Sequence, residues 1–368
     1  MSNLWWKGID SPGGGYAQEE VICLRWWQLL YLPWLRQVKK LLTLGIETSC
    51  DDTSVALLEG SRNLLRFLVA SQLKDHEAYG GVVPELASRK HLENLIPLLS
   101  QLLDECHIKN PSREINLIAV TDGPGLMGSL LIGTTAAKAL AQAWEVPLMT
   151  VNHLEGHIFA NYLAHEDLLP PFITLIISGG HTELILVKSF GDYSLLGATR
   201  DDAVGEAFDK VARLLGLGYP GGPLIDEMAR RGDPFAVALP IPMADSPDIE
   251  FSFSGLKTAV LWALKRNPHV RVEDLCASFQ YSAIEALLRK VDLAVKTTGI
   301  DKVAISGGVA ANSQLREKVK AKPWRAYIPP KELCTDNAAM IAAAGCNAYR
   351  RGERSSLSFM PDPAKTLA

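Results

Sequence analysis

The stretch from Leu42 to Leu58, L-T-L-G-I-E-T-S-C-D-D-T-S-V-A-L-L, decides the fold class of this chain. Its first six residues, Leu42 to Glu47, predict a strand, and Val55 to Leu58 predict a second strand that runs back. Between them, Thr48 to Ser54 form a short polar segment that is typical of a tight turn. The first clearly predicted element of the chain is therefore a β-hairpin with a polar turn.

The second half of the chain repeats this order. Phe172 to Ile177 predicts a strand, Ser178 to Thr182 (S-G-G-H-T) a tight turn, and Glu183 to Lys188 the returning strand. Each half then has a strand that enters a glycine turn before a helix, at Asp122 to Gly125 and at Ser306 to Gly308. Such turns gather backbone N–H groups at one place and suit an anion. The pattern predicts an α/β fold that resembles the actin-like ATPases (ASKHA), with two duplicated lobes around a nucleotide cleft.

Further elements follow from hydrophobic periodicity. Pro84 to Leu103 predicts a helix with one apolar face, made by Leu86, Leu92, Leu95, Ile96, Leu99 and Leu102. The other predicted elements are a strand at 115–121, a helix at 126–144, a strand at 302–305, a helix at 310–320, a strand at 326–328 and a helix at 338–349. We expect a first lobe at 41–150, a second lobe at 151–350 with an insertion at 200–254, and a tail at 351–368.

The composition narrows the class of protein. The chain has 368 residues, a net charge of −4 and 48% hydrophobic residues, without an apolar run of the roughly 18 residues that a spanning helix needs. Its six cysteines are scattered, and no C-x-x-C pair occurs, which predicts reduced thiols and a cytoplasmic protein without stable membrane association. The negative net charge excludes a protein that coats nucleic acid with a generally basic surface. It is compatible with a local basic patch.

Residues 1–40 differ from the rest, because five of the eight tryptophans lie in them. A secretory signal is disfavoured, since Asp10 comes early and Arg25 interrupts the apolar run. One interpretation is an interfacial anchor, because tryptophans and cations favour the boundary between water and lipid. The other, which we favour, is a translation start assigned too far upstream, with Val38 near the true beginning.

The segment Asn152 to His157, N-H-L-E-G-H, predicts a metal site. On a helix, His153 and His157 are four residues apart and share one face, so both imidazoles can reach one ion. Glu155 is not at the position of the general base in H-E-x-x-H peptidases. The spacing alone does not identify a third ligand. Asp336 is one candidate, because it precedes a predicted helix, although an N-cap explains it equally well.

Several motifs together resemble one family, the universal tRNA threonylcarbamoyladenosine transferases, called TsaD in bacteria. They are the opening L-G-I-E-T-S-C-D-D-T (44–53), H-E-A-Y-G-G-V-V-P-E-L-A-S-R-K-H (76–91), H-L-E-G-H (153–157), S-G-G-H-T (178–182), D-D-A-V-G-E-A-F-D-K to Y-P-G-G-P-L-I-D (201–226), F-S-F-S-G-L-K-T (251–258), S-G-G-V-A-A-N-S-Q-L-R (306–316) and T-D-N-A-A-M (335–340). The departures are the N-terminal extension and Asp52, where many members carry glutamate.

The resemblance implies an acyltransferase that moves a threonylcarbamoyl group from threonylcarbamoyl-adenylate to the exocyclic amine of adenosine 37. Its tRNA substrates would read codons beginning with adenine. It implies a divalent metal, Fe²⁺ with Zn²⁺ as the alternative, on His153, His157 and Asp336. The donor would contact Ile177, Ser178, Gly179, Gly180, His181, Asp209, Gly222, Asp226 and Asn312. Bacterial members act with a non-catalytic paralogue (TsaB-like) and a small ATPase (TsaE-like).

The chemistry leaves room for a proton acceptor and for rival functions. A purine amine is a poor nucleophile, so a carboxylate near the metal would take its proton, and Asp51 is our candidate; ordering the hairpin turn is its alternative role. The rival functions are an actin-fold phosphotransferase or ATPase, a metallopeptidase, and a nucleotide-binding scaffold without chemistry. The histidine pair argues against the phosphotransferase, and the missing H-E-x-x-H argues against the peptidase. Retention of the complete motif set, including both histidines and Asp336, argues against the scaffold.

Overall fold

Ten strands in residues 41–368, the part of the chain that the computed structural model describes, form two five-stranded sheets. In the first sheet the order is β3-β2-β1-β4-β5, and in the second it is β8-β7-β6-β9-β10. The strands are β1 (Leu42–Glu47), β2 (Asp52–Glu59), β3 (Asn63–Ser71), β4 (Leu117–Gly123), β5 (Leu148–Asn152), β6 (Phe172–Ile177), β7 (Thr182–Ser189), β8 (Asp192–Ala198), β9 (Lys302–Ser306) and β10 (Arg325–Tyr327).

The two sheets share one topology. A central strand, β1 or β6, pairs antiparallel with its hairpin partner and parallel with β4 or β9. The outer strands β5 and β10 continue the parallel side, whereas β3 and β8 continue the antiparallel side. This shared order confirms the predicted duplication of an α/β unit.

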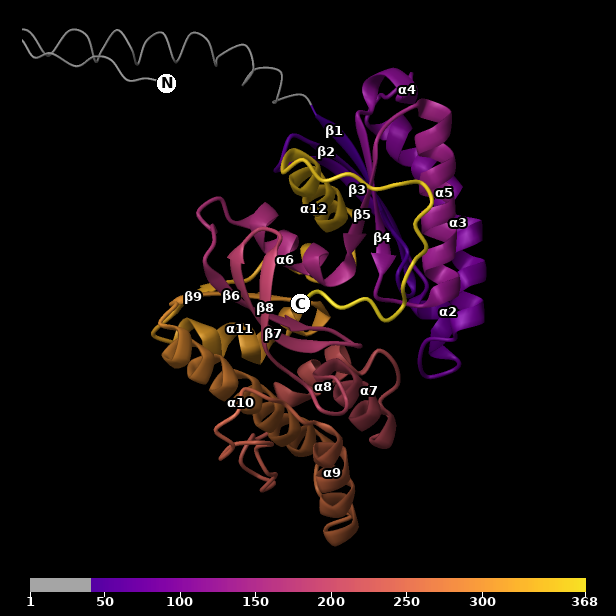
Figure 1. Ribbon diagram of the computed structural model, residues 1–368. Helices are drawn as coiled ribbons and strands as arrows, with labels where there is room; N and C mark the ends of the chain where they lie inside the picture. The colour runs from indigo at the N-terminus through magenta and orange to yellow at the C-terminus, as the bar shows by residue number, and fades with distance from the viewer. Residues whose placement is uncertain (1–40) are drawn as a thin grey trace, which may run out of the picture. The chain divides into compact units, whose positions relative to one another are not determined.

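Helices connect and cover the sheets (Figure 1). They are α2 (Leu73–Glu77), α3 (Pro84–Glu105), α4 (Pro111–Glu114), α5 (Met127–Trp144), α6 (His153–Ala164), α7 (Val204–Leu214), α8 (Gly221–Ala229), α9 (Ser254–Arg266), α10 (Val272–Thr298), α11 (Ser313–Lys320) and α12 (Ala338–Arg350). No helix within residues 41–368 is both long and apolar enough to cross a membrane.

Alternation along the strands explains which helix covers which face. In β1, Leu44 and Ile46 belong to a core shared with α3 and α5. Gly45 points the other way, where an added Cβ would lie 2.2 Å from the carbonyl oxygen of Ala338. A glycine is therefore required here, because α12 lies directly on the opposite face of the first sheet.

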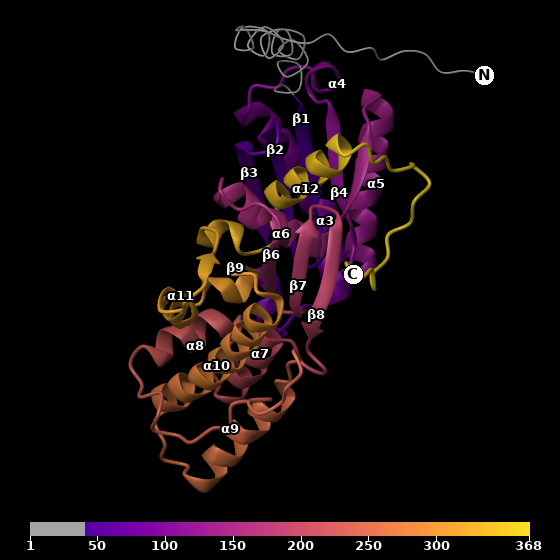
Figure 2. The same cartoon turned by 60° about the vertical axis from the view of Figure 1, so that its left-hand side comes forward.

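The second sheet is covered in the same manner. Its Phe172 and Ile176 pack against α6, whereas Ile173 and Leu175 share a larger core with α7 and α10. Helices α6 and α12 contact each other, since a Cβ at Gly156 would lie 2.7 Å from Cδ1 of Ile341. The two helices thus form the central layer between the sheets, as Figure 2 shows from the side.

Some local predictions were wrong. Leu92 and Ile96 are 66% and 58% exposed, so the buried stripe of α3 runs through Leu95, Leu99 and Leu102 without them. The helix expected from 310 begins at Ser313, after a 3-10 turn at Gly308–Ala311. Strands β3, β5 and β8 were not predicted. In β3 and β8 much of the surface is solvent-exposed, so a continuous apolar signal is missing.

The expected division into lobes remains a prediction. The position of α12 bears on where such a division would run. This helix follows all strands of the second sheet in sequence and yet packs on the first sheet. Between β8 and β9 the chain forms α7 to α10, whereas the corresponding part of the first half forms α2 to α4. The two interpretations of residues 1–40 lie outside the described residues.

Candidate active site and metal centre

The first part of the site is the start of α6. The side chain of Asn152 accepts a hydrogen bond from the backbone N–H of Leu154 (2.8 Å) and caps the helix, which begins at His153. His153 and His157 are then one turn apart, both buried, with ring centroids 4.8 Å apart. The prediction that H-x-x-x-H lies on a helix with both rings on one side is confirmed.

Asp336 joins the two histidines from the loop before α12. Its Oδ1 lies 3.4 Å from Nε2 of His153 and 3.4 Å from Nε2 of His157. The N-cap of α12 is Asn337, whose side chain accepts from the backbone N–H of Met340 (3.1 Å). Asp336 is thus not the N-cap, and its carboxylate is left to face the imidazoles. The three side chains form a group that could hold a metal ion.

These three residues fit a divalent metal by two independent observations. Both ring nitrogens of His157 are buried: among residues 41–368, Nδ1 has no hydrogen-bond partner and Nε2 has only its long contact with Asp336, at 3.4 Å. Two ligands about 2.0–2.2 Å from a tetrahedral ion are themselves about 3.4 Å apart, and this is the separation between Asp336 and each imidazole. A buried polar atom without a partner is costly, and a metal bond would remove that cost.

A second layer of polar groups holds His153. Its Nδ1 lies 3.1 Å from Oε2 of Glu47 and 3.1 Å from Oγ of Ser49. Glu47 also accepts from the hydroxyl of Thr121 (2.6 Å) and from the backbone N–H of Ser49 (2.5 Å). A carboxylate on the far nitrogen of a ligating histidine fixes the ring orientation and the tautomer. Sequence reasoning missed this role of Glu47, although the residue lies inside the quoted opening motif.

The electrostatics of the cluster favour a cation. Burial by itself would raise the pKa of the two carboxyl groups. The neighbouring His153 outweighs this effect: it holds the pKa of Asp336 well below the ordinary value for aspartate and the pKa of Glu47 below the ordinary value for glutamate. Burial also disfavours the imidazolium of His153, but the two carboxylates raise its pKa well above the ordinary value. Burial lowers the pKa of His157, which keeps that ring neutral and able to bind a metal.

The first hairpin turn adds two more carboxylates. Burial, opposed by a hydrogen bond from Cys50 and aided by the negative charge of Asp336, raises the pKa of Asp51. Burial raises the pKa of Asp52 further, to about 7, against the stabilising effect of Ser71. Asp51 as the proton acceptor stays a prediction, and sequence reasoning did not foresee the larger pKa shift of Asp52. The adjacent pair of aspartates is visible in the sequence, but the burial that raises the pKa of Asp52 is not.

The S-G-G-H-T turn of the second half lies near the metal ligands. Ser178 and His181 close it through two hydrogen bonds, from the N–H of Ser178 to the carbonyl of His181 (2.9 Å) and from the N–H of His181 to Oγ of Ser178 (3.1 Å). Burial and then the charges of His153 and His157 lower the pKa of His181 to about 4. Gly179 and Gly180 are exposed, and a Cβ on either would contact nothing within 4 Å.

The remaining donor candidates form pairs in α7, in α8 and at the start of α11. Asp209 accepts from the backbone N–H of Gly221 (2.7 Å), next to Gly222. Asp226 accepts from the hydroxyl of Ser313 (2.7 Å), and Asn312 caps α11 by accepting from the N–H of Leu315 (3.0 Å).

One hydrogen bond and one electrostatic effect relate these pairs to the rest of the site. The N–H of Gly205 in α7, one turn before Asp209, donates to the carbonyl of Ser178 (3.2 Å). After burial, the charges of Asp51 and Asp209 are the next causes that raise the pKa of Tyr219, so the segment before α8 lies near the first hairpin turn. Ile177, which ends β6 before the turn, is fully buried. Tyr219 and Gln280, which accepts a bond from Asn312 (2.7 Å), were not predicted.

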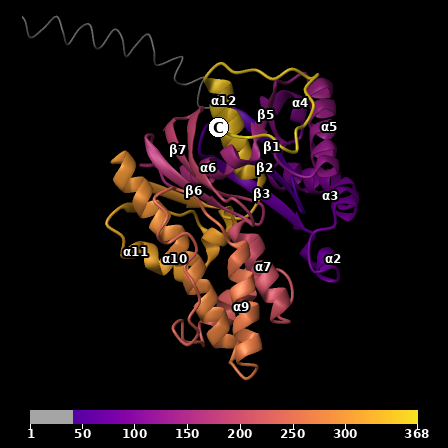
Figure 3. The same ribbon diagram turned by 60° about the horizontal axis from the view of Figure 1, so that its bottom comes forward.

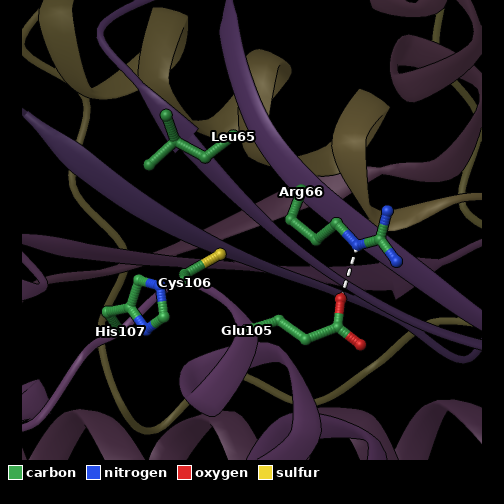
Figure 4. Close-up of a pocket in the computed structure, with 5 residues that line it drawn as sticks. All are labelled: Leu65, Arg66, Glu105, Cys106 and His107. Atoms are coloured by element: carbon green, nitrogen blue, oxygen red, sulfur yellow. Dashed lines mark hydrogen bonds and ion pairs between the residues drawn. The ribbon is translucent and has the colours of Figure 1, made fainter.

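A separate surface pocket of about 480 Å³ is lined by Leu65, Arg66, Glu105, Cys106 and His107 (Figure 4). Nε of Arg66 and Oε2 of Glu105 are 2.7 Å apart across it. None of the metal ligands, carboxylates or turn residues of the candidate site lines this pocket, so the pocket is a feature distinct from that site.

Comparison with known proteins gives one family. The model of the TsaD family, tRNA N6-adenosine threonylcarbamoyltransferase, matches residues 63–343. The chain is 49% identical over 332 residues to the tRNA N6-adenosine threonylcarbamoyltransferase of Fervidobacterium nodosum, with 88% of this chain and 98% of the relative aligned. It is 47% identical over 331 residues to that of Clostridioides difficile, covering 88% of this chain and 97% of the relative.

Solved structures confirm the fold class. HypF of T. kodakarensis superposes with a TM-score of 0.58 at 15% identity, over 85% of this chain and 48% of that one. The activator of 2-hydroxyisocaproyl-CoA dehydratase from Clostridium difficile, solved with bound ADPNP, gives a TM-score of 0.52 at 13% identity, over 85% of this chain and 97% of that one. The described part of the chain has the actin-like ATPase (ASKHA) fold that the duplicated halves predicted.

Proposed function

The chain belongs to the TsaD family of tRNA N6-adenosine threonylcarbamoyltransferases, and we propose that its reaction takes place between the His153–His157–Asp336 group and the S-G-G-H-T turn. The protein is a transferase that forms threonylcarbamoyladenosine at position 37 of tRNA. The location is supported by the buried group itself, in which Oδ1 of Asp336 lies 3.4 Å from both imidazoles, and by His181, whose pKa is lowered by burial and then by the charges of those imidazoles.

We propose Fe²⁺ as the metal, with Zn²⁺ as the alternative. Two histidines and one carboxylate with open positions are typical of non-haem Fe²⁺ sites, and the same ligand types suit Zn²⁺. When bound, the ion would supply Lewis acidity toward the acyl group of the donor. His153, His157 and Asp336 would hold it, and Glu47 would keep the ring of His153 in its ligating orientation.

The donor would lie along the second lobe. Gly179 and Gly180 leave open space where a side chain would obstruct a nucleotide, which supports close approach of the backbone. The other residues that we propose to contact the donor are Ile177, Ser178, His181, Asp209, Gly222, Asp226 and Asn312.

The N6 amine of adenosine 37 then attacks the carbamoyl carbon, a C–N bond forms, and the C–O bond to the adenylate phosphate breaks. AMP leaves with the electron pair of that bond. The proton lost by the amine passes to a carboxylate, for which we propose Asp51. Because burial raises its pKa above the ordinary value, Asp51 is a better proton acceptor than an exposed aspartate.

Partners and compartment belong to the same proposal. The acidic net charge of −4 suggests that other subunits supply part of the grip on tRNA. We propose a non-catalytic TsaB-like paralogue and a TsaE-like ATPase, acting in the cytoplasm on adenylate that another enzyme has made.

The test combines metal analysis with single-turnover transfer from pre-made adenylate to tRNA, on protein purified anaerobically. We expect about one equivalent of metal in the native protein, and loss of both metal and transfer in His153→Ala and His157→Ala. His269→Ala, which removes an exposed histidine elsewhere, is the control for metal content. Full metal occupancy in either site variant would refute the ligand assignment.

A further inference from the structure

The segment from 251 to 272, which contains α9, is basic. It contains Lys257, Lys265, Arg266 and Arg271 and no aspartate or glutamate, in a chain whose net charge is −4. Local charge of this kind attracts a polyanion even when the whole protein is acidic. The catalytic chemistry proposed above uses none of these four residues.

Helix α9 has a buried face and an exposed face of different character. Leu256 and Val260 are buried in the core that α9 shares with β6, α7 and α10. Trp262 lies on the other side and is 54% exposed, and Lys265 and Arg266 are exposed beside it at i+3 and i+4. The ammonium of Lys265 is 5.0 Å from the centroid of the Trp262 ring. Within residues 41–368, neither cation forms an ion pair with a carboxylate.

Trp262 is not explained by the core. The apolar face of α9 is already complete without it, so about half of a large aromatic side chain is left in water. An exposed aromatic ring flanked by cations is the combination with which proteins bind single-stranded or loop nucleotides, through stacking and phosphate contacts. In all three views, α9 lies at the end of the described unit away from α12 (Figure 3).

From these observations we propose that the exposed face of α9 is a docking surface for the tRNA substrate. Lys265 and Arg266 contact phosphates of the tRNA, and the Trp262 ring stacks on one nucleotide. The proposal rests on the tRNA-modifying activity of the family, but it concerns substrate binding at a distance from the metal ligands. Variants of this face should therefore change the KM for tRNA and leave the kcat and the metal content as they are.

The experiment measures binding of full-length tRNA to the full chain as a function of salt, together with steady-state transfer. Trp262→Leu should weaken binding about 5-fold or more, because stacking is lost while apolar character is kept, and Trp262→Phe should restore most of it. Lys265→Gln with Arg266→Gln should lower the salt dependence of binding by about 1.5 in the slope of log K against log salt.

The matched control is Lys320→Gln with Lys331→Gln, two exposed cations outside α9 whose loss changes the net charge equally. An unchanged KM and Kd for tRNA in the α9 variants would overturn the proposal. Equal weakening in the control would also overturn it, because overall charge would then explain the effect. Loss of kcat in every variant would implicate the catalytic site instead.

Discussion

Substitution of Lys365 by methionine tests how the C-terminal tail supports the site. The ammonium of Lys365 lies 2.7 Å from both carboxylate oxygens of Asp122, whose residue is only 6% exposed. Nearby, the N–H of Asp362 donates to the carbonyl of Asp122, and the N–H of Gly125 donates to that of Pro363. The tail thus lies on the glycine turn after β4.

The magnitude follows from burial. Removing one partner of a buried pair costs about 3–5 kcal/mol, but the Lys365 side chain is 34% exposed, so we reduce this to about 1–3 kcal/mol. The melting temperature should fall by about 2–8 °C. The control is Lys322→Met: Asp292, its partner at 2.7 Å, is 41% exposed and keeps a bond from Trp324, so that loss should stay below about 1 kcal/mol.

The pH dependence gives a second criterion. Burial already holds the pKa of Asp122 above its ordinary value despite Lys365, and loss of the cation raises this pKa further. The charged carboxyl therefore costs the folded variant stability at pH 7–8, and protonation removes that cost as the pH falls. Differential scanning fluorimetry from pH 8 to pH 5 should show the deficit shrinking. A deficit that grows on acidification, or one equal to that of Lys322→Met, would refute the reasoning.

Three further predictions concern the site and the N-terminal segment. Glu47→Gln should weaken metal binding about 10–100-fold in a chelator competition, because the support of His153 is lost. Asp209→Ala and Asn312→Asp should each weaken adenylate or ATP binding, measured by calorimetry, and leave the metal content unchanged. Aspartate is chosen at 312 because its carboxylate can still cap α11. Loss of metal in both variants would mean that the donor site and the metal site are wrongly divided. A chain that starts at Lys40 should match the full chain in melting temperature and in transfer activity. A large fall in melting temperature would contradict this, because removing even one tryptophan from a core costs about 3–5 kcal/mol of folding free energy.

Patterns of short range predicted much of the fold and part of the site. Alternation over Leu42 to Glu47 and Phe172 to Ile177, together with the polar turns after them, was enough for the two hairpins and for their duplication. The four-residue spacing of His153 and His157 was enough for a shared helical face, because that geometry is a property of the helix alone.

Contacts of long range were not accessible in this way. Asp336 reaches the histidines only because α12 returns to the first sheet after the whole second sheet has formed, a placement that no spacing encodes. The family resemblance supplied this ligand, whereas residue spacing left it open. Glu47, Tyr219 and Gln280 depend on the same three-dimensional proximity, and the pKa of Asp52 depends on burial, which a polar turn sequence does not reveal.

The glutamate inside H-L-E-G-H shows how position on a helix decides chemistry. Glu155 follows His153 by two residues, so its side chain leaves α6 on the side away from the imidazoles. There it accepts a hydrogen bond from the hydroxyl of Tyr193 (2.6 Å) and lies 3.8 Å from Nη2 of Arg351. A metallopeptidase needs a carboxylate beside the metal-bound water, whereas Glu155 ties α6 to β8 and to the residue after α12. The five residues therefore present two metal ligands on one side of the helix and anchor it on the other, which suits a site that holds an acyl donor in place.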